Sequence, residues 1–153
     1  MARTDLIEHL NHALSLELAG VIQYMQHSFL VTGTEREVYR PFFRDQSKEA
    51  HAHATTLGDK VVALGGVPTV EPAMIRQSIR LIEMLQQNLT LEREAVEAYL
   101  AAWKACDDTD INTRFQLEER LAEEQKHIEE LEKLTSERTA SITSERITLR
   151  QVG

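Results

Sequence analysis

The chain contains few of the residues that interrupt, cross-link or anchor a fold. Its 153 residues include six glycines, three prolines and a single cysteine, Cys106, which excludes an internal disulfide and suits a reducing compartment. Aromatic residues make up only 5% of the chain, which argues against an all-β fold. No apolar run approaches the roughly 20 residues that cross a bilayer, and charged residues break up the start of the chain. We therefore expect no membrane span and no secretory signal, and we expect a cytoplasmic protein.

The residues that are abundant favour one helical domain with an acidic surface. Leu, Ala, Glu, Gln and Arg dominate the sequence, and all of them are good helix formers. A chain of this length suits a single domain and is long enough to bury a substantial core. The formal net charge of −8 disfavours nucleic acid and anionic membranes as partners, and it allows the surface to attract cations.

Four long segments are predicted to be helical. They cover residues 5–31, 34–64, 74–105 and 111–136. Pro41 is expected to kink or restart the second helix, and the glycine pair 65–66 is expected to end it. Residues 107–110 offer several N-caps for the fourth helix. Two pairs have capping-box spacing at the starts of the first and second helices: Asp5 with Glu8, and Thr34 with Glu37.

The connection between the second and third segments predicts the topology. Residues 67–72 read Val-Pro-Thr-Val-Glu-Pro, an extended linker with two prolines. About ten extended residues reach ~33 Å, roughly the length of a 22-residue helix. The second helix can therefore end at one end of a bundle while the third begins at the other. We predict an all-α, up-down-down-up four-helix bundle over residues 1–136, with a long crossover between the second and third helices and a C-terminal extension over residues 137–153.

The C-terminal extension differs in pattern from the bundle. Thr-Ser-Glu-Arg occurs twice, at residues 135–138 and 143–146, and apolar residues alternate with polar ones without a helical period. Two interpretations stay open: a segment that docks on a neighbouring subunit, and a frayed terminus.

The fourth helical segment carries a Glu-x-x-His step from Glu124 to His127. Residues three apart share a helix face, so the carboxylate and the imidazole project together. Glu124 also interrupts the apolar stripe between Leu121 and Ile128. A carboxylate that faces a bundle core is costly unless it is paired or bound to a metal ion. We therefore predict that this step binds metal.

Two other predicted helices repeat this interruption. Glu17 and Glu92 each replace an apolar residue in a stripe, and Tyr24 and Tyr99 follow seven residues later on the same face. A phenol near an inner carboxylate can donate a hydrogen bond to it. One such glutamate is commonly a residue that reaches solvent from the edge of a stripe, but the same pattern in three helices favours an inner polar site.

The two halves of the chain repeat the same Glu–His spacing. Glu17 precedes His53 by 36 residues, and Glu92 precedes His127 by 35. This repeated spacing predicts two helix pairs related by a pseudo-twofold axis, each supplying one lone glutamate and one Glu/His cluster. Such a set is the plan of a carboxylate-bridged dinuclear centre in a four-helix bundle. Carboxylate oxygen and imidazole nitrogen suit iron or manganese.

These residues lie in motifs that resemble the bacterioferritin branch of the ferritin-like family, over residues 6–134. The motifs are Leu10–Glu17 followed by Gln23-Tyr24, Leu64–Pro68, Leu91-Glu92 and Glu124-x-x-His127. The resemblance implies a di-iron centre with the following roles: ligands of one iron (Glu17, His53), ligands of the other (Glu92, His127), a bridge (Glu124) and a neighbour that touches the ligands (Tyr24).

The second helical segment departs from the family pattern. The family's second bridging glutamate falls three residues before His53, where this chain has Ala50. The available carboxylate is Glu49, which points about 100° away from position 50 around the helix but only about 40° from His53. Glu49 can join the cluster as a metal ligand, or it can be an ordinary surface residue beside Lys48. Without it the centre lacks one bridge and holds one metal ion, or two loosely.

His51 is a second departure from the family pattern. The family has a methionine here that binds haem between two subunits, and a symmetry-related pair of His51 side chains could take that role. The alternative is a solvated or interface histidine. His51 and His53 point in different directions from one helix, so both cannot enter one metal site.

The leading functional prediction is a ferroxidase that oxidises Fe²⁺ with O₂ or H₂O₂, together with iron storage. Two alternatives stay open. One is a non-catalytic ferritin-like protein that binds haem or a single metal ion, and the other is a di-iron oxidase or peroxidase that acts on another substrate. The expected partners are Fe²⁺, the oxidant and further copies of the chain, from a dimer up to a shell.

Overall fold

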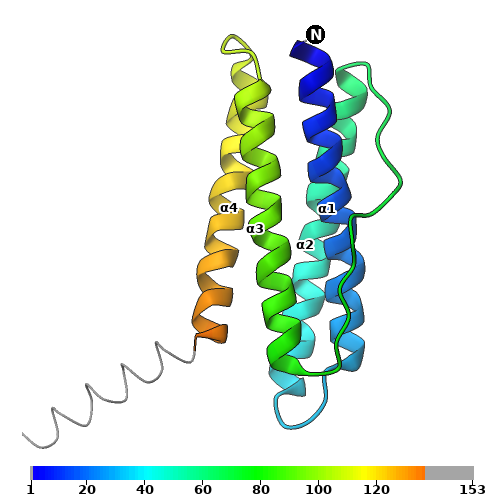
Figure 1. Cartoon of the computed structure of the whole chain (residues 1–153), viewed down its shortest axis with the longest axis vertical. Coiled ribbons are helices and arrows are strands. Elements are labelled where there is room, and N and C mark those ends of the chain that lie inside the picture. The colour runs from blue at the N-terminus through cyan, green and yellow to red at the C-terminus, as the bar shows by residue number, and fades with distance from the viewer. Residues whose placement is uncertain (1, 137–153) are drawn as a thin grey trace, which may run out of the picture.

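The computed structural model of the protein describes residues 2–136, which form four helices and no strand (Figure 1). The helices are α1 (Ala2–Leu30), α2 (Arg36–Ala63), α3 (Leu81–Ala105) and α4 (Ile111–Thr135). The predicted all-α class is confirmed. The predicted C-terminal extension, residues 137–153, lies outside the described residues. None of the four helices just named holds a stretch long and apolar enough to span a membrane.

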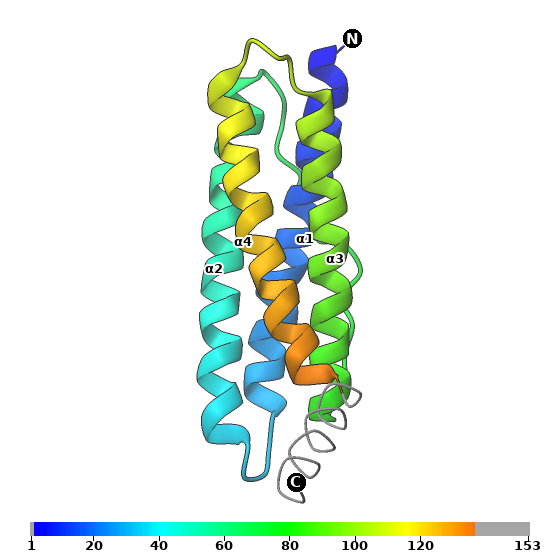
Figure 2. The ribbon, with the colours of Figure 1, turned by 90° about the vertical axis from the view of Figure 1, so that its left-hand side faces the viewer.

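The helices have the order and directions of the predicted up-down-down-up bundle. A short loop joins α1 to the antiparallel α2, α3 runs parallel to α2, and α4 returns antiparallel to α3 (Figures 1 and 2). α1 packs closely against α2 and α3, and α3 packs closely against α4, whereas α2 and α4 approach each other less closely. Long side chains that reach into the centre are therefore needed to connect α2 with α4.

The crossover is longer than the sequence predicts. Residues 64–80 separate α2 from α3, and α3 begins at Leu81 instead of residue 74. Hydrogen bonds to α1 hold this segment extended along that helix and pair some of its backbone groups (Figure 1). The backbone N–H groups of Thr69, Ala73 and Arg76 donate to Asn11 Oδ1, Ser15 O and Gln23 Oε1, respectively.

Two of the predicted helix ends are confirmed. Gly65 follows α2 with φ of +89°, and the N–H groups of residues 65–66 donate back to the carbonyls of residues 62 and 61. This pattern is a Schellman motif, which favours glycine at the left-handed position. Asp110 caps α4, because its side chain accepts a hydrogen bond of 3.2 Å from the backbone N–H of Thr113.

Both capping-box predictions are wrong. α1 begins at Ala2, three residues before Asp5, so Asp5 lies in the first turn of the helix and not at its N-cap. A carboxylate in the first turn interacts favourably with the helix dipole. The residue at the N-cap of α2 is Glu35 instead of Thr34. The helix also runs through Pro41 without a restart. Pro41 stands near the start of α2, where the loss of one backbone donor interrupts little of the helix.

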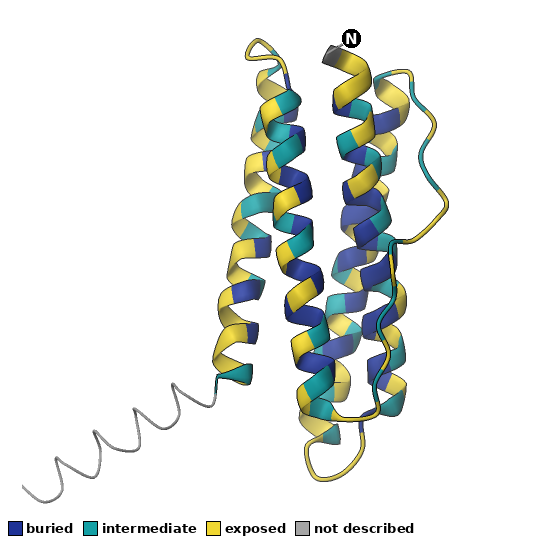
Figure 3. Cartoon of the chain, in the orientation of Figure 1, coloured by how far each residue is buried: buried dark blue, intermediate teal, exposed yellow. Residues whose placement is uncertain are grey.

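Two buried apolar clusters fill the bundle on either side of its centre. Figure 3 shows that all four helices contribute buried positions. One includes Leu10, Leu14, Leu57, Tyr99 and Leu117, and the other includes Tyr24, Phe43, Met84, Ile128 and Leu131. The inward glutamates of α1 and α4 fall near the boundary between the two clusters. Apolar packing above and below therefore encloses a polar centre.

Candidate metal centre

Four polar side chains meet at the middle of the bundle, one from each helix. They are Glu17 of α1, His53 of α2, Glu92 of α3 and Glu124 of α4, and none is more than 8% exposed. His127 lies one turn beyond Glu124 and joins the cluster with a side chain that is 16% exposed. Burial of three carboxylates is costly unless partners or a metal ion compensate their charge.

Glu17, His53 and Glu124 form the first group of this cluster. His53 Nδ1 lies 3.3 Å from Glu17 Oε1 and 3.1 Å from Glu124 Oε1. One ligand atom from each of the three residues lies within 4.8 Å of the others. Two carboxylates and an imidazole at this spacing suit a single iron or manganese ion.

Glu92, Glu124 and His127 form the second group, again with one ligand atom each within 4.8 Å of the others. His127 Nδ1 lies 3.6 Å from Glu124 Oε2 and 4.0 Å from Glu92 Oε2. Both His127 Nδ1 and Glu124 Oε2 are buried, and neither has a hydrogen-bond partner in the part of the chain that is described. A cation between them would satisfy both atoms. Glu124 thus turns a different oxygen to each group, which is the geometry of a bridge.

Two tyrosines hold the lone glutamates by hydrogen bonds that cross the bundle. Tyr24 of α1 donates to Glu92 Oε1 of α3 at 2.7 Å, and Tyr99 of α3 donates to Glu17 Oε1 of α1 at 2.7 Å. The sequence places each tyrosine on the same face as the glutamate of its own helix, whereas the structure pairs it with the glutamate of the other helix. The exchange ties α1 to α3 and repeats the predicted pseudo-twofold arrangement.

Glu49 joins the cluster from its outer side. Its Oε2 lies 3.2 Å from His127 Nε2, and its Oε1 lies 3.8 Å from His53 Nε2. Ala50 is buried instead against α1, where a methyl group added at Gly20 would lie 3.4 Å from Ala50 Cβ. The structure therefore places the Glu49 carboxylate beside both histidines, and its role as a metal ligand stays a prediction.

Glu123 belongs to the site and is missed by the sequence reasoning. Its Oε2 lies 2.9 Å from His53 Nε2 and 2.9 Å from Arg120 Nη1. With Glu49 it places a second carboxylate at the outer nitrogen of His53, and the three residues make another group of potential ligand atoms within 4.8 Å. The signal in the sequence is weak, because Arg120 and Glu123 have the spacing of an ordinary surface ion pair on a helix.

Burial and mutual repulsion leave protons tightly held in this cluster. Burial raises the pKa of Glu17 to about 7 and raises the pKa of Glu92 well above its usual value, and the charge of Glu124 adds to both shifts. Burial opposes ionisation of Glu124 too, but its close contacts with Glu92 and the two histidines outweigh this effect and lower its pKa. Burial opposes protonation of His53, but its contacts with Glu124 and Glu17 raise the pKa to about 10. Metal binding must displace such protons, which makes it pH dependent.

His51 lies on the exposed side of α2, whereas His53 is buried. Neighbours at this spacing point to different sides of a helix. The structure therefore separates the candidate haem ligand from the cluster of candidate metal ligands.

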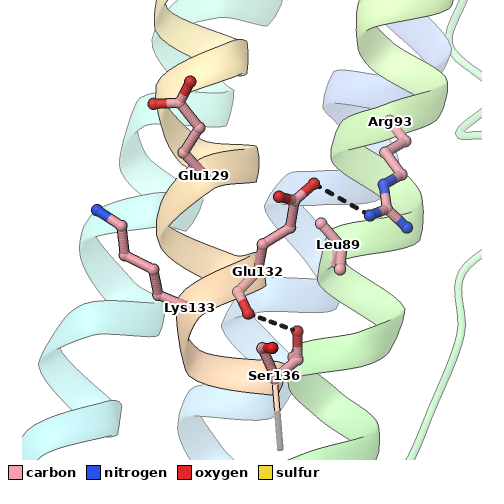
Figure 4. Close-up of a pocket in the computed structure, with 7 residues that line it drawn as sticks. Leu89, Arg93, Glu129, Glu132, Lys133 and Ser136 are labelled. Carbon is pink, nitrogen blue, oxygen red and sulfur yellow. Dashed lines mark hydrogen bonds and ion pairs between the residues drawn. The ribbon is translucent and has the colours of Figure 1, made fainter. Parts of the chain in front are cut away.

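A surface groove of about 470 Å³ lies apart from this cluster, between α3 and α4 (Figure 4). Arg93 and Glu132 pair across it at 3.1 Å, and Leu89 contributes an apolar wall. The described residues that line the groove do not include the buried glutamates or histidines of the centre. The groove therefore adds nothing to the metal chemistry.

Comparison with known proteins connects this geometry to a family. The ferritin-like domain family matches residues 7–139. The bacterioferritin of Brucella melitensis is 34% identical over 130 residues, which cover 82% of this chain and 80% of that protein. The nutrient stress-induced DNA-binding protein of Synechococcus sp. is 28% identical over 134 residues, which cover 88% of this chain and 64% of that protein.

Solved structures show the same relationship in three dimensions. A ferritin-like, diiron-carboxylate protein from Bacillus anthracis superposes with a TM-score of 0.85 at 31% identity and covers 89% of this chain and 99% of its own. The bacterioferritin of Rhodobacter capsulatus, described with a metal-free dinuclear site and a haem iron, superposes with a TM-score of 0.77 at 26% identity over 86% of this chain and 84% of its own. The chain therefore belongs to the ferritin-like family, in its bacterioferritin-like branch.

Proposed function

We propose that the protein binds two Fe²⁺ ions at this centre and oxidises them with O₂ or H₂O₂. The observation that carries the proposal is Glu124, because its two oxygens face two separate Glu/His groups. A bridging carboxylate holds two cations at a short and fixed separation. The ions are substrates, and each gives one electron to the oxidant.

Charge balance supports a pair of divalent ions. Two Fe²⁺ ions bring four positive charges, and the three inner carboxylates bring three negative charges when they are ionised. Glu49 brings a fourth negative charge from the outer side of the histidines. Both imidazoles are neutral when they coordinate a metal. Glu123 is paired with Arg120, so it adds little to this balance.

The buried carboxylates also favour oxidation. A ferric ion carries one more positive charge than a ferrous ion, so carboxylates in a water-poor centre stabilise the ferric state more strongly. The hydrogen bonds from Tyr24 and Tyr99 keep Glu92 and Glu17 directed at the centre. The protein thus supplies fixed ligand geometry and charge, and the oxidant takes the electrons.

An anaerobic Fe²⁺ titration of the metal-free protein, followed by mixing with air-saturated buffer, tests the proposal. We expect two tightly bound Fe²⁺ ions per chain and a rise of ferric absorbance well above the background rate. Glu124→Ala should abolish tight binding while the helix survives, because alanine is a better helix former. Glu129→Ala is the matched control, since Glu129 is an exposed residue of the same helix. Unchanged stoichiometry in Glu124→Ala would refute the assignment.

We further infer that copies of the chain assemble, which storage of oxidised iron requires. Ile22, Met25 and Phe29 of α1 are exposed apolar residues beside the half-buried Ile75 of the crossover, and Phe29 alone is 57% exposed. Contiguous exposed apolar side chains mark interaction surfaces. Light scattering should show an oligomer for the wild type and a smaller species for Phe29→Glu. Equal masses would contradict this assignment of the interface.

Haem binding at His51 is a second candidate function. His51 is exposed on α2 and available to a second copy, and the Rhodobacter capsulatus relative is described with haem iron. Two histidines, one from each copy, could supply both axial ligands. Titration with haem should give the absorption spectrum of a bis-histidine complex in the wild type and not in His51→Ala. Identical spectra would exclude this role.

A further inference from the structure

The two histidines of the centre share one orientation. Each turns Nδ1 inward, where His53 meets Glu17 and Glu124 at 3.3 and 3.1 Å and His127 meets Glu124 at 3.6 Å. Each turns Nε2 outward, where His53 and His127 lie 3.8 and 3.2 Å from the two oxygens of Glu49. One carboxylate on α2 therefore spans the outer sides of both imidazoles.

A neutral imidazole has one nitrogen with a free lone pair and one N–H group. If Nδ1 binds a metal ion, Nε2 carries the hydrogen and needs an acceptor. Glu49 Oε2 lies 3.2 Å from His127 Nε2, within hydrogen-bond distance, whereas Glu49 Oε1 lies 3.8 Å from His53 Nε2, too far for a hydrogen bond. We propose that Glu49 is a positioning residue that orients His127 by accepting from its Nε2–H, leaves the Nε2–H of His53 to Glu123, and does not itself bind the metal ions. This inference rests on the proposed dinuclear centre.

The position of Glu49 explains how the chain tolerates alanine at residue 50. The Ala50 side chain packs against α1 near Gly20, so no carboxylate enters the centre from that position. Glu49 restores the missing negative charge from behind the histidines. It also joins α2 to His127 of α4, the two helices that approach each other less closely than the other neighbouring pairs.

The two halves of the centre depend on Glu49 to different degrees. His53 Nε2 has a second carboxylate, Glu123, at 2.9 Å, and Arg120 holds that carboxylate in place at 2.9 Å. The carboxylate paired with His127 Nε2 is Glu49. Loss of Glu49 should therefore release His127 and leave His53 held by Glu123.

Direct metal binding by Glu49 makes a different prediction. Glu49, Glu123 and His53 Nε2 lie close enough together to form an outer metal site. A neutral His53 cannot offer lone pairs at both nitrogens, so an outer ion would compete with the inner ion for this ring. An outer site would appear as a third ion or as an inner site that loses an ion.

Cobalt(II) loading of the whole protein separates these roles without turnover. Calorimetry gives the number of Co²⁺ ions and their affinities, and proton NMR of the Co²⁺ form shows the shifted, exchangeable Nε2–H signals of bound histidines. The variants are Glu49→Ala, Glu49→Gln and Glu123→Ala. Glu129→Ala, an exposed position on α4, is the control.

We expect two Co²⁺ ions per chain in the wild type and in Glu49→Ala, with one ion bound about 10- to 100-fold more weakly in the variant, as for lost partners of metal-bound histidines. One Nε2–H signal should vanish through exchange with water in Glu49→Ala and return in Glu49→Gln, whose amide oxygen still accepts a hydrogen bond. Glu123→Ala should affect the other signal.

Three results would overturn the inference. A fall to one Co²⁺ ion in both Glu49 variants would make Glu49 a ligand, because an amide replaces a carboxylate ligand poorly. A third ion in the wild type that is lost in Glu49→Ala would assign an outer metal site. Unchanged signals and affinities would leave Glu49 with no role. The wild-type stoichiometry tests the proposed function separately, since fewer than two ions there would refute the dinuclear centre itself.

Discussion

The Glu124→Gln substitution keeps the size of the central side chain and removes its charge. Glu124 is 1% exposed, and its two oxygens lie 3.1 Å from His53 Nδ1 and 3.6 Å from His127 Nδ1. Two cations bound beside these nitrogens would both lie close to the Glu124 carboxylate. The loss of charge should therefore weaken both metal positions together.

The magnitude follows from these short distances. At an effective dielectric constant of about 20, two unit charges 4 Å apart attract by about 4 kcal/mol, and a divalent ion roughly doubles this energy. The variant no longer has to bury a charged carboxylate, and this gain offsets part of the lost attraction. The net cost of removing one partner from a buried ion pair is about 3–5 kcal/mol. We expect metal affinity to fall by roughly 100- to 4,000-fold.

Anaerobic calorimetry with Fe²⁺ measures this loss. Glu130→Gln is a matched control, because Glu130 is an exposed residue of the same helix that pairs with Lys133 at 3.1 Å. Surface pairs of this kind contribute little. A loss of less than tenfold in Glu124→Gln, or an equal loss in the control, would refute the bridging role.

Three further predictions concern the surroundings of the centre. Tyr24→Phe removes the 2.7 Å hydrogen bond to Glu92. Because hydrogen bonds to charged groups contribute about 1.5–3 kcal/mol, calorimetry should show one Fe²⁺ ion bound about 10- to 100-fold more weakly. Equal affinities in the variant and the wild type would contradict this. Ala50→Glu places a larger, charged side chain against Gly20 of α1, so the free energy of unfolding of the metal-free variant should fall by about 1–3 kcal/mol. Calorimetry should show a lower thermal midpoint, and an unchanged midpoint would show that the new side chain does not enter the contact between α1 and α2. His27 is fully buried, and burial lowers its pKa to about 4, so the stability that it contributes above pH 6.5 should fall, by at most about 3 kcal/mol, as the pH is lowered towards 4. The thermal midpoint of metal-free His27→Gln should fall less than that of the wild type over this range, and parallel curves would refute the shift.

The crossover shows what local sequence patterns predict and what they miss. The prolines and extended residues at 67–72 predict that the chain changes ends of the bundle, because chain reach is a geometric limit. The start of α3 at Leu81 is not predictable in the same way. Residues 73–80 stay extended because they bond to groups of α1, such as Gln23, that are distant in sequence.

The inward glutamates were predictable because each interrupts an apolar stripe, and burial in a bundle follows the stripe. Glu123 was not, because its side chain is 43% exposed and its bond to Arg120 looks like a surface pair. The angle of Glu49 around α2 does not by itself predict whether its side chain reaches the histidines. Its position depends on how closely α4 brings His127 to it, which is a tertiary distance.

X-ray diffraction at the iron absorption edge, on crystals soaked anaerobically with Fe²⁺, tests the dinuclear centre most directly. We expect two anomalous peaks per chain, one beside Glu17 and His53 and the other beside Glu92 and His127, with Glu124 between them. A single peak, or peaks only on the outer side between Glu49 and Glu123, would contradict this expectation.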